Sequence, residues 1–271
     1  MNNPRYYFGN YIKIHQINDF FDHVRIMLLE HFDKPSYTNV LFVIGSTSIF
    51  SCRQLKEENP DYKLILYQLE QFMDGSNWNT TSTLIKNMEG ADEIWDYDEL
   101  NALYLKNKYN IQVNKIVPLL YTQNLDLINN KKDPNIDVLF YGYLNDRRYK
   151  ILRHIQHECF LHLKIVWVFG TIDLNRYIED SKIILNLHAF EPWSRQEQVR
   201  LFYPIINSKT IVSERSQLNY FGDSIVEEDT VELPRKLKSI CYNGTWRTIG
   251  SKAKQDFITR TNNFLKTNNL I

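Results

Sequence analysis

Polar and charged side chains follow an apolar, β-branched segment in the second half of the chain, at the point where that segment ends. The segment Asp137–Tyr141 leads into Gly142 and then into a helix start that carries Asn145, Arg147 and Arg148. A glycine lets the backbone approach a ligand, and arginines bind phosphate groups through charge and paired N–H donors. This segment therefore predicts a turn that holds an anion such as a diphosphate.

Three later segments end in the same manner. Ile165–Phe169 ends at Gly170, Ile183–Leu187 ends at His188 with Glu191 close behind, and Thr210–Val212 ends at Ser213 and Glu214. Ligands of open α/β sheets bind beyond the carboxyl ends of the strands, so we expect these side chains to gather in one site. Glu197 and Arg200 follow on the next predicted helix, where they are either part of this site or an ordinary i,i+3 surface pair. Turn glycines, a solvated first helical turn and a sheet-edge histidine are the ordinary alternatives for the others.

The elements that position these residues are short apolar runs alternating with amphipathic stretches. In the first half, strands are expected at 11–14, 39–45, 63–69, 93–96 and 114–118, and helices at 17–33, 47–57, 78–89 and 97–108. In the second half, strands are expected at 136–141, 163–169, 183–188, 210–212 and 224–226, and helices at 145–158, 172–181, 194–206, 231–242 and 247–268. This alternation predicts an α/β fold with parallel sheets and helices on both faces.

A polar segment at 124–135, which contains NNKKDPN, interrupts the alternation and is the expected linker. Residues 1–123 are then an N-terminal Rossmann-like domain and residues 136–246 a C-terminal one. Residues 247–271 form a C-terminal helix, for which packing against the N-terminal domain is one possibility.

The composition excludes several classes of protein. The 32 basic and 32 acidic residues cancel, whereas a protein that binds nucleic acid normally has a basic excess. Three scattered cysteines without CxxC spacing indicate reduced thiols. No stretch approaches the apolar length of a membrane span, so a soluble, cytoplasmic protein of a cell or an infected host cell is expected, with at most peripheral membrane contact. A homodimer is possible, and the His154–His157 spacing matches no zinc motif.

Longer strings carry a family resemblance. DVLFYGYLNDRRYKIL, VFG and SKIILNLHAFEPWSRQEQVRLFYPIINSKTIVSE resemble the donor domain of a GT-B glycosyltransferase. They are most similar to a bacterial and giant-virus branch related to the family 4 and CgeB-like enzymes. KLILYQLEQF and ADEIWDYDELNALYL resemble the N-terminal domain of the same branch. The resemblance covers residues 38–216 and implies two Rossmann-like domains that face each other across a cleft, with a long C-terminal helix.

The resemblance also implies roles for the residues named above. The substrate would be a nucleoside-diphosphate sugar such as a UDP- or GDP-sugar, with no cofactor. The implied donor-binding residues are Gly142, Asn145, Arg147 and Arg148 near the diphosphate, Gly170 near the base, Glu197 and Arg200 with Glu197 on the ribose, and Ser213 and Glu214 closing the pocket. His188 and Glu191, near the donor sugar or its phosphate, are implied to be catalytic. The implied acceptor side holds Gly45, Ser46, Glu70, Gln71 and Asp96, of which Glu70 or Asp96 is the base in an inverting reaction. One departure is that five residues separate Glu191 from Glu197, where family 4 enzymes have seven.

The expected function is transfer of a sugar to a hydroxyl group of a glycan, lipid or protein. We expect no compact Asp-x-Asp in a strand-end loop of this sequence, so a metal-independent reaction is expected. The family 4 likeness favours retention. Two alternatives stay open. One is a nucleotide-sugar-binding or scaffolding protein without catalysis, and the other is a hydrolase or epimerase of nucleotide sugars with the same fold.

Overall fold

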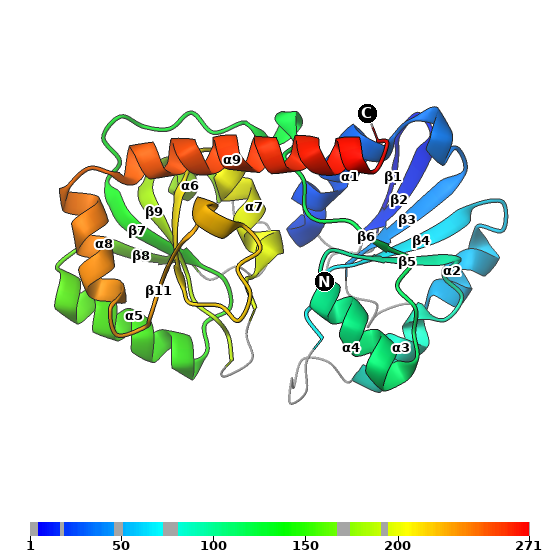
Figure 1. Ribbon diagram of the computed structural model, residues 1–271, viewed down its shortest axis with the longest axis horizontal. Coiled ribbons are helices and arrows are strands. Elements are labelled where there is room, and N and C mark those ends of the chain that lie inside the picture. Colours follow the sequence, from blue (N-terminus) through cyan, green and yellow to red (C-terminus); the bar gives the residue numbers. More distant parts are fainter. Residues whose placement is uncertain are drawn as a thin grey trace. The chain divides into compact units, whose positions relative to one another are not determined.

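The computed structural model describes residues 5–16, 19–45, 51–72, 81–166, 174–190 and 195–270. The chain divides into two compact units, Met1–Leu119 and Leu120–Ile271, and each contains one sheet. Figure 1 shows the strands and helices of both units. Ser46, Gly170 and Glu191, three of the expected site residues, lie outside the described residues.

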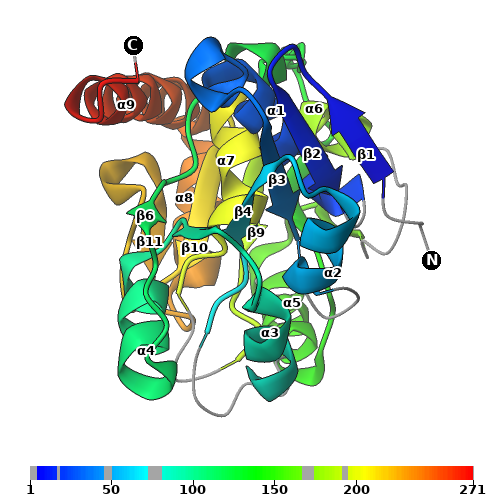
Figure 2. The same ribbon diagram turned by 90° about the vertical axis from the view of Figure 1, so that its right-hand side faces the viewer.

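The first unit has a six-stranded sheet in which the strands follow their order in the chain. The strands are β1 (Arg5–Phe8), β2 (Ile12–Gln16), β3 (Val40–Ile44), β4 (Lys63–Gln68), β5 (Glu93–Asp96) and β6 (Lys115–Ile116). From β2 to β6 all pairs are parallel, whereas β1 pairs with β2 antiparallel. Figure 2 shows β1, β2 and β3 side by side. The sequence pattern predicted the five parallel strands of this unit but missed β1.

Helices cover both faces of this sheet. They are α1 (Asp22–Phe32), α2 (Cys52–Glu58), α3 (Thr81–Met88) and α4 (Glu99–Tyr109), with short 3-10 turns η1 (Asp19–Phe21) and η2 (Pro35–Tyr37). On one face, α2, α3 and α4 pack on alternate residues of β3 and β4, among them Leu41 and Leu64. On the other face, the Phe32 ring of α1 packs edge-on against Trp95 at a centroid distance of 5.3 Å.

The second unit has a five-stranded, fully parallel sheet. Its strands are β7 (Ile136–Tyr141), β8 (Leu163–Val166), β9 (Ser181–Asn186), β10 (Thr210–Glu214) and β11 (Val226–Glu228), in the order β11-β10-β9-β7-β8. The chain adds β8 on one side of β7 and then β9 on the other side. The order of the strands therefore reverses at β7, and in such sheets the ligand crevice lies at the carboxyl ends of the strands where this happens.

The helices of the second unit are α5 (Asp146–Cys159), α6 (Asn175–Glu179), α7 (Gln198–Ile206), α8 (Leu233–Tyr242) and α9 (Trp246–Thr267), with η3 (Gln123–Leu125) and η4 (Gly222–Ser224). Figure 1 shows α5 and α8 together on one face of the sheet, and α6 and α7 on the other. The core beneath α5 and α8 includes Val138 and Phe140 of β7 and Leu152 of α5, all fully buried. The predicted α/β fold with two parallel-strand sheets is confirmed.

The long helix α9 packs on the second unit through a glycine. A Cβ atom on Gly250 would lie 2.1 Å from the Ser208 carbonyl oxygen, so only a glycine lets the helix approach this closely. The Thr210 hydroxyl also donates a hydrogen bond to the Trp246 carbonyl. A contact between α9 and the N-terminal domain stays a prediction.

The segment expected to be a linker is tied to the second unit. The backbone N–H groups of Leu127 and Ile128 donate to Asn207 Oδ1 at 3.0 and 2.8 Å.

All three cysteines are free and buried. Among the helices of the described ranges, none is both long enough and apolar enough to cross a bilayer.

Candidate functional site

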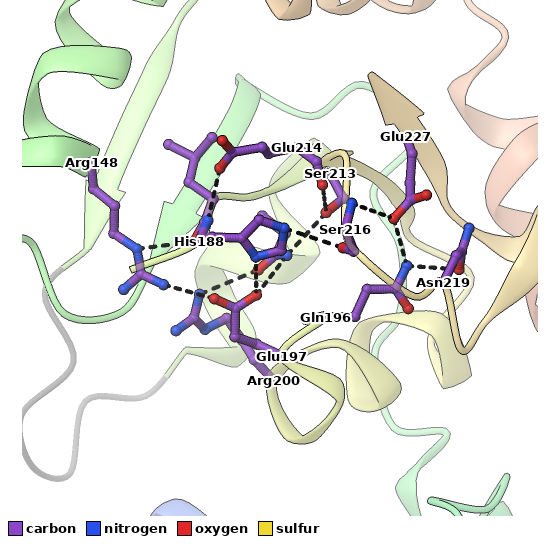
Figure 3. Close-up of polar contacts among 12 residues, drawn as sticks. Arg148, His188, Gln196, Glu197, Arg200, Ser213, Glu214, Ser216, Asn219 and Glu227 are labelled. Carbon is purple, nitrogen blue, oxygen red and sulfur yellow. Dashed lines mark hydrogen bonds and ion pairs between the residues drawn. The ribbon is translucent and has the colours of Figure 1, made fainter. Parts of the chain in front are cut away.

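The carboxyl ends of β7, β9 and β10 carry a connected set of charged and polar side chains. Gly142 directly follows β7, His188 lies two residues after β9, and Glu214 is the last residue of β10. Glu197 precedes α7, and Arg200 lies in its first turn. Figure 3 shows the side chains of Arg148, His188 and Arg200 around Glu197. The structure thus brings together expected residues that are up to 72 positions apart in the chain, as between Gly142 and Glu214.

Glu197 is the centre of this network. Its Oε1 accepts a hydrogen bond from Arg148 Nη2 at 3.0 Å, and its Oε2 accepts one from Asn186 Nδ2 at 2.9 Å. The Oε2 atom also lies 3.2 Å from His188 Nδ1. Burial raises the pKa of Glu197, but the His188 ring and the Arg200 and Arg148 guanidinium groups outweigh it and lower that pKa to about 2. Glu197 is therefore ionised at neutral pH.

His188 lies between two hydrogen-bonding side chains. Nδ1 faces Glu197, and Nε2 lies 3.2 Å from Ser216 Oγ. Burial lowers the pKa of His188, but Glu197 and Glu214 outweigh this effect and bring the net pKa above its ordinary value. An imidazole with a raised pKa is protonated more often near neutral pH, so it can supply positive charge or a proton in this site.

Arg147 and Glu214 form a bidentate ion pair. Arg147 Nη1 donates to Glu214 Oε2 at 3.0 Å, and Nη2 donates to Oε1. Glu214 also accepts the His188 backbone N–H at 3.0 Å and the Thr230 hydroxyl at 2.9 Å. Burial raises the pKa of Glu214, but the hydrogen bond from Arg147 and the further donors lower it below the ordinary value. An anion that binds Arg147 must share it with this carboxylate.

Arg148 is buried more deeply than the neighbouring Arg147, because its side chain is only 2% exposed. Its Nε donates to the Leu187 carbonyl at 2.9 Å, and its Nη1 donates to the Tyr143 carbonyl at 2.7 Å. With the bond to Glu197, these contacts join β9, the turn after β7 and α7. Burial and Arg200 lower its pKa to about 10. In this geometry Arg148 supports the site from inside, and Asn145 caps α5 by accepting the Arg148 backbone N–H at 3.0 Å.

Arg200 lies against Gly142. The φ angle of Gly142 is +134°, and a Cβ atom at this position would lie 3.1 Å from Arg200 Cζ. Arg200 Nη1 donates a hydrogen bond to Asn186 Oδ1 at 3.3 Å. Within the described ranges, the Arg200 guanidinium has no carboxylate oxygen within 4.0 Å. Gly142 is required here for its backbone conformation, and it also gives the guanidinium room.

Ser213 closes the network on β10. Its hydroxyl accepts from Asn186 Nδ2 at 3.0 Å and donates to the Glu214 carbonyl at 2.7 Å. Sequence reasoning missed Asn186, although a polar residue inside the apolar run of β9 is a usable signal. It also missed Ser216 and Thr230, which lie in loops that no local pattern distinguishes.

The expected acceptor residues lie at the strand ends of the first unit. Asp96 is fully buried and accepts hydrogen bonds from the Asp98 N–H at 2.9 Å and Asn101 Nδ2 at 3.1 Å. Asp98 caps α4 by accepting the Leu100 N–H at 2.7 Å. The expectation that no Asp-x-Asp stands at a strand end is therefore wrong, since Asp96 and Asp98 form one directly at the end of β5. Each of the two carboxylates accepts a backbone N–H in the turn into α4.

Glu70, the other expected base, follows β4, and burial raises its pKa above the ordinary value. Its role as a base stays a prediction. Its backbone carbonyl accepts Asn101 Nδ2 at 2.8 Å, which fixes the loop. Gln71 follows it and is half-buried. Gly45, at the end of β3, has a φ of +111° and so also needs to be a glycine.

No group of three or more His, Cys, Asp or Glu side chains that could hold a metal ion is found in the described part of the chain. Metal independence stays a prediction.

Comparison with known proteins gives few sequence matches and clear structural ones. No protein-family model matches the chain. An uncharacterised protein of Acanthamoeba polyphaga mimivirus is 24% identical over 164 residues, which are 58% of this chain and 51% of that protein. The chain therefore spans about half the length of this relative.

Two of the solved structures that the chain resembles match it over most of its length. An S. aureus TarM mutant in complex with Fondaparinux, alpha-GlcNAc-glycerol and UDP matches with a TM-score of 0.57 and 14% identity, over 85% of this chain and 55% of TarM. Sucrose-phosphate synthase from Thermosynechococcus elongatus matches with a TM-score of 0.54 and 12% identity, over 81% of this chain and 69% of the synthase. Both are GT-B glycosyltransferases, and at these identities the likeness concerns the fold. The chain has the α/β architecture of the GT-B class.

Proposed function

We propose that the protein is a glycosyltransferase that moves a sugar from a nucleoside-diphosphate sugar to a hydroxyl group of an acceptor. The GT-B fold supports this, because the structures it resembles include glycosyltransferases and one of them contains UDP. The observation that carries the proposal is the charge network at the carboxyl ends of β7, β9 and β10. It lies where the strand order reverses, which is the expected ligand position in such a sheet.

The charges of this network suit a diphosphate. Three arginines face two carboxylates, which leaves one net positive charge, and protonation of His188 adds a second. Arg200 is the first candidate for direct contact, because its guanidinium lies beside Gly142 and forms no ion pair within the described ranges. Arg147 is the second, since an incoming phosphate can share its N–H donors with Glu214.

The network also suits the chemistry of transfer. The bond between the anomeric carbon and the diphosphate oxygen breaks as the bond to the acceptor oxygen forms, and negative charge builds up on the diphosphate. The departing diphosphate oxygen then takes the proton of the acceptor hydroxyl. Fixed positive groups stabilise this charge without rearranging during the reaction. In the proposed reaction Arg200, Arg147 and protonated His188 supply the positive charge, and no metal ion is needed. Glu197 holds Arg148 and His188 in place. Contact with the donor ribose is also proposed for its carboxylate, whose side chain is 20% exposed.

The transfer is proposed to be retaining, and the product configuration measured by NMR decides this point. Retention does not need a base on the acceptor side. Inversion does need one, and Glu70 with its raised pKa would then be the candidate. The acceptor is proposed to be a glycan, a lipid or a protein hydroxyl.

A thermal-shift screen against UDP-, GDP-, dTDP- and CMP-sugars tests the proposal. A cognate donor at about one hundred times its Kd stabilises the folded state by about 2.7 kcal/mol. For a chain of this size that is a rise in Tm of roughly 5–10 °C. Arg200→Ala should remove most of the rise, whereas Arg153→Ala should keep it, because Arg153 is an exposed cation on α5 outside the network.

Turnover then separates the alternatives. Transfer to an acceptor supports the proposal. Tight binding without sugar release would identify a binding or scaffolding protein, and release of free sugar faster than any transfer would identify a hydrolase. No shift with any of the four donors would contradict the proposed donor site.

A further inference from the structure

A second polar depression lies at the opposite edge of the same sheet, at the amino-terminal ends of β7, β8 and β9. Its volume is about 500 Å³, and it is an open depression in the surface rather than an enclosed cavity. Its lining includes four basic side chains, Lys131, His162, Lys164 and Arg176. They come from the segment before β7, from the start of β8 and from α6, so the fold gathers them from separate parts of the chain.

The lining contains one carboxylate, Asp180, and its oxygen atoms already have hydrogen-bond and ion-pair partners. Its Oδ1 accepts hydrogen bonds from the Asn135 N–H at 2.9 Å and Asn135 Nδ2 at 3.0 Å. Lys131 Nζ lies 3.2 Å from the same oxygen. Asp180 therefore fixes the start of β7 and neutralises Lys131, which leaves the other basic side chains of the depression without this counter-charge.

Lys164 and Arg176 converge on one aromatic ring. Lys164 Nζ lies 5.4 Å from the Tyr177 ring centroid, and Arg176 Cζ lies 4.6 Å from it. Arg176 Nη2 also donates to the Tyr177 hydroxyl at 2.7 Å. In the described part of the chain neither cation has a carboxylate within 4.0 Å. Two like charges around one ring repel each other, and a bound anion would remove this repulsion.

The His162 ring is held in place by a hydrogen bond of its own. Its Nδ1 lies 2.6 Å from the Asn135 carbonyl oxygen, so Nδ1 carries the hydrogen and donates it. This contact fixes the ring next to Asn135, whose side chain also holds Asp180. The basic residues of the depression are thus positioned by neighbouring groups at several points. The chain as a whole has no net charge, so a generally basic surface does not explain this accumulation.

We propose that this depression binds a phosphate group. A guanidinium with free N–H donors and an ammonium group on a second element match a tetrahedral oxyanion, which accepts hydrogen bonds from several directions. The depression has room for a phosphate ester of a small hydroxylated molecule as well as for free phosphate, and the phosphate group is what both have in common. This site is separate from the charge network at the carboxyl ends of the strands, and it does not depend on the function proposed for that network.

Isothermal titration calorimetry tests this site with two probes, inorganic phosphate and glucose 6-phosphate, at constant ionic strength set with sodium chloride. We expect both to bind the wild-type chain, and the ratio of their Kd values tells whether the sugar adds contacts. The double variant Lys164→Ala/Arg176→Ala should weaken binding of both at least tenfold. The control variant Arg153→Ala/Lys266→Ala removes the same charges from exposed positions on α5 and α9 and should bind like wild type.

The variants remove exposed or half-exposed side chains, and far-UV circular dichroism checks that they fold. UDP binding by the folded double variant should equal that of the wild type, which separates this site from the proposed donor site. Three results would overturn the proposal: no binding of either probe at millimolar concentration, equal binding by the double variant, or equal loss in the control variant.

Discussion

The most informative perturbation of the charge network is Glu197→Gln, because it removes one charge and changes the shape of the side chain very little. Glu197 accepts bonds from Arg148 and Asn186 and faces His188. The glutamine leaves the buried Arg148 guanidinium without its carboxylate. Breaking a buried ion pair by removing one partner typically costs about 3–5 kcal/mol.

The pKa of Glu197 gives an independent magnitude. A fall from 4.5 to about 2 corresponds to roughly 3 kcal/mol of stabilisation by the ionised carboxylate. Because the folded-state pKa is lowered, this stabilisation is present above pH 4.5 and is lost as the pH falls toward 2. We therefore expect Glu197→Gln to lower the free energy of unfolding by about 3 kcal/mol at pH 7 and by roughly half of that at pH 3.

Urea unfolding followed by tryptophan fluorescence measures this loss. Glu232→Gln is the matched control, because Glu232 pairs with Arg235 on an exposed part of α8 and should cost less than about 0.5 kcal/mol. NMR of the His188 ring gives a second readout. Without Glu197, burial should dominate and bring the pKa of His188 below 6.5. A loss under about 1 kcal/mol together with an unchanged His188 pKa would refute the account of this network.

Two further predictions concern the fold around the sites. Burial lowers the pKa values of His15 and His23 to about 4, so between pH 6.5 and 4 the unfolded chain binds protons that the folded chain does not, and acid destabilises the fold. Each histidine should lower the free energy of unfolding by roughly 2 kcal/mol on going from pH 7 to pH 5. His23→Gln should therefore reduce the pH dependence of that free energy, measured by urea unfolding. An unchanged pH dependence would contradict the lowered pKa of His23. Gly250→Ala should destabilise the chain by roughly 3 kcal/mol, because the added Cβ would meet the Ser208 carbonyl under α9. Gly244→Ala is its control, since Gly244 has a φ of +67° but open space around it, and should cost about 1 kcal/mol in the same thermal-unfolding measurement.

The sequence allowed much of the fold to be predicted, because buried parallel strands leave apolar runs separated by amphipathic helices. The edge strand β1 was missed, since it is mostly exposed and carries no buried apolar run. It pairs with β2 antiparallel after a short turn, and the alternation of strands and helices does not predict such a hairpin.

Several of the expected site residues do lie together at one edge of the sheet, but the partners of their charges were not predictable. Arg147 and Arg148 are neighbours in the chain, yet successive residues of a helix point in directions about 100° apart. One therefore reaches Glu214 and the other turns inward to Glu197. These contacts span 67 and 49 positions, and no local spacing rule relates residues so far apart.

The central claim is that a nucleoside diphosphate binds at the carboxyl ends of β7, β9 and β10. Calorimetric titration of UDP, GDP, dTDP and CDP into the wild type and into Arg200→Ala at pH 7 tests it most directly. We predict micromolar binding of at least one of them and at least tenfold weaker binding by the variant, which is about 1.4 kcal/mol. Absence of binding by all four at millimolar concentration, or equal affinity in the Arg200→Ala variant, would contradict the claim.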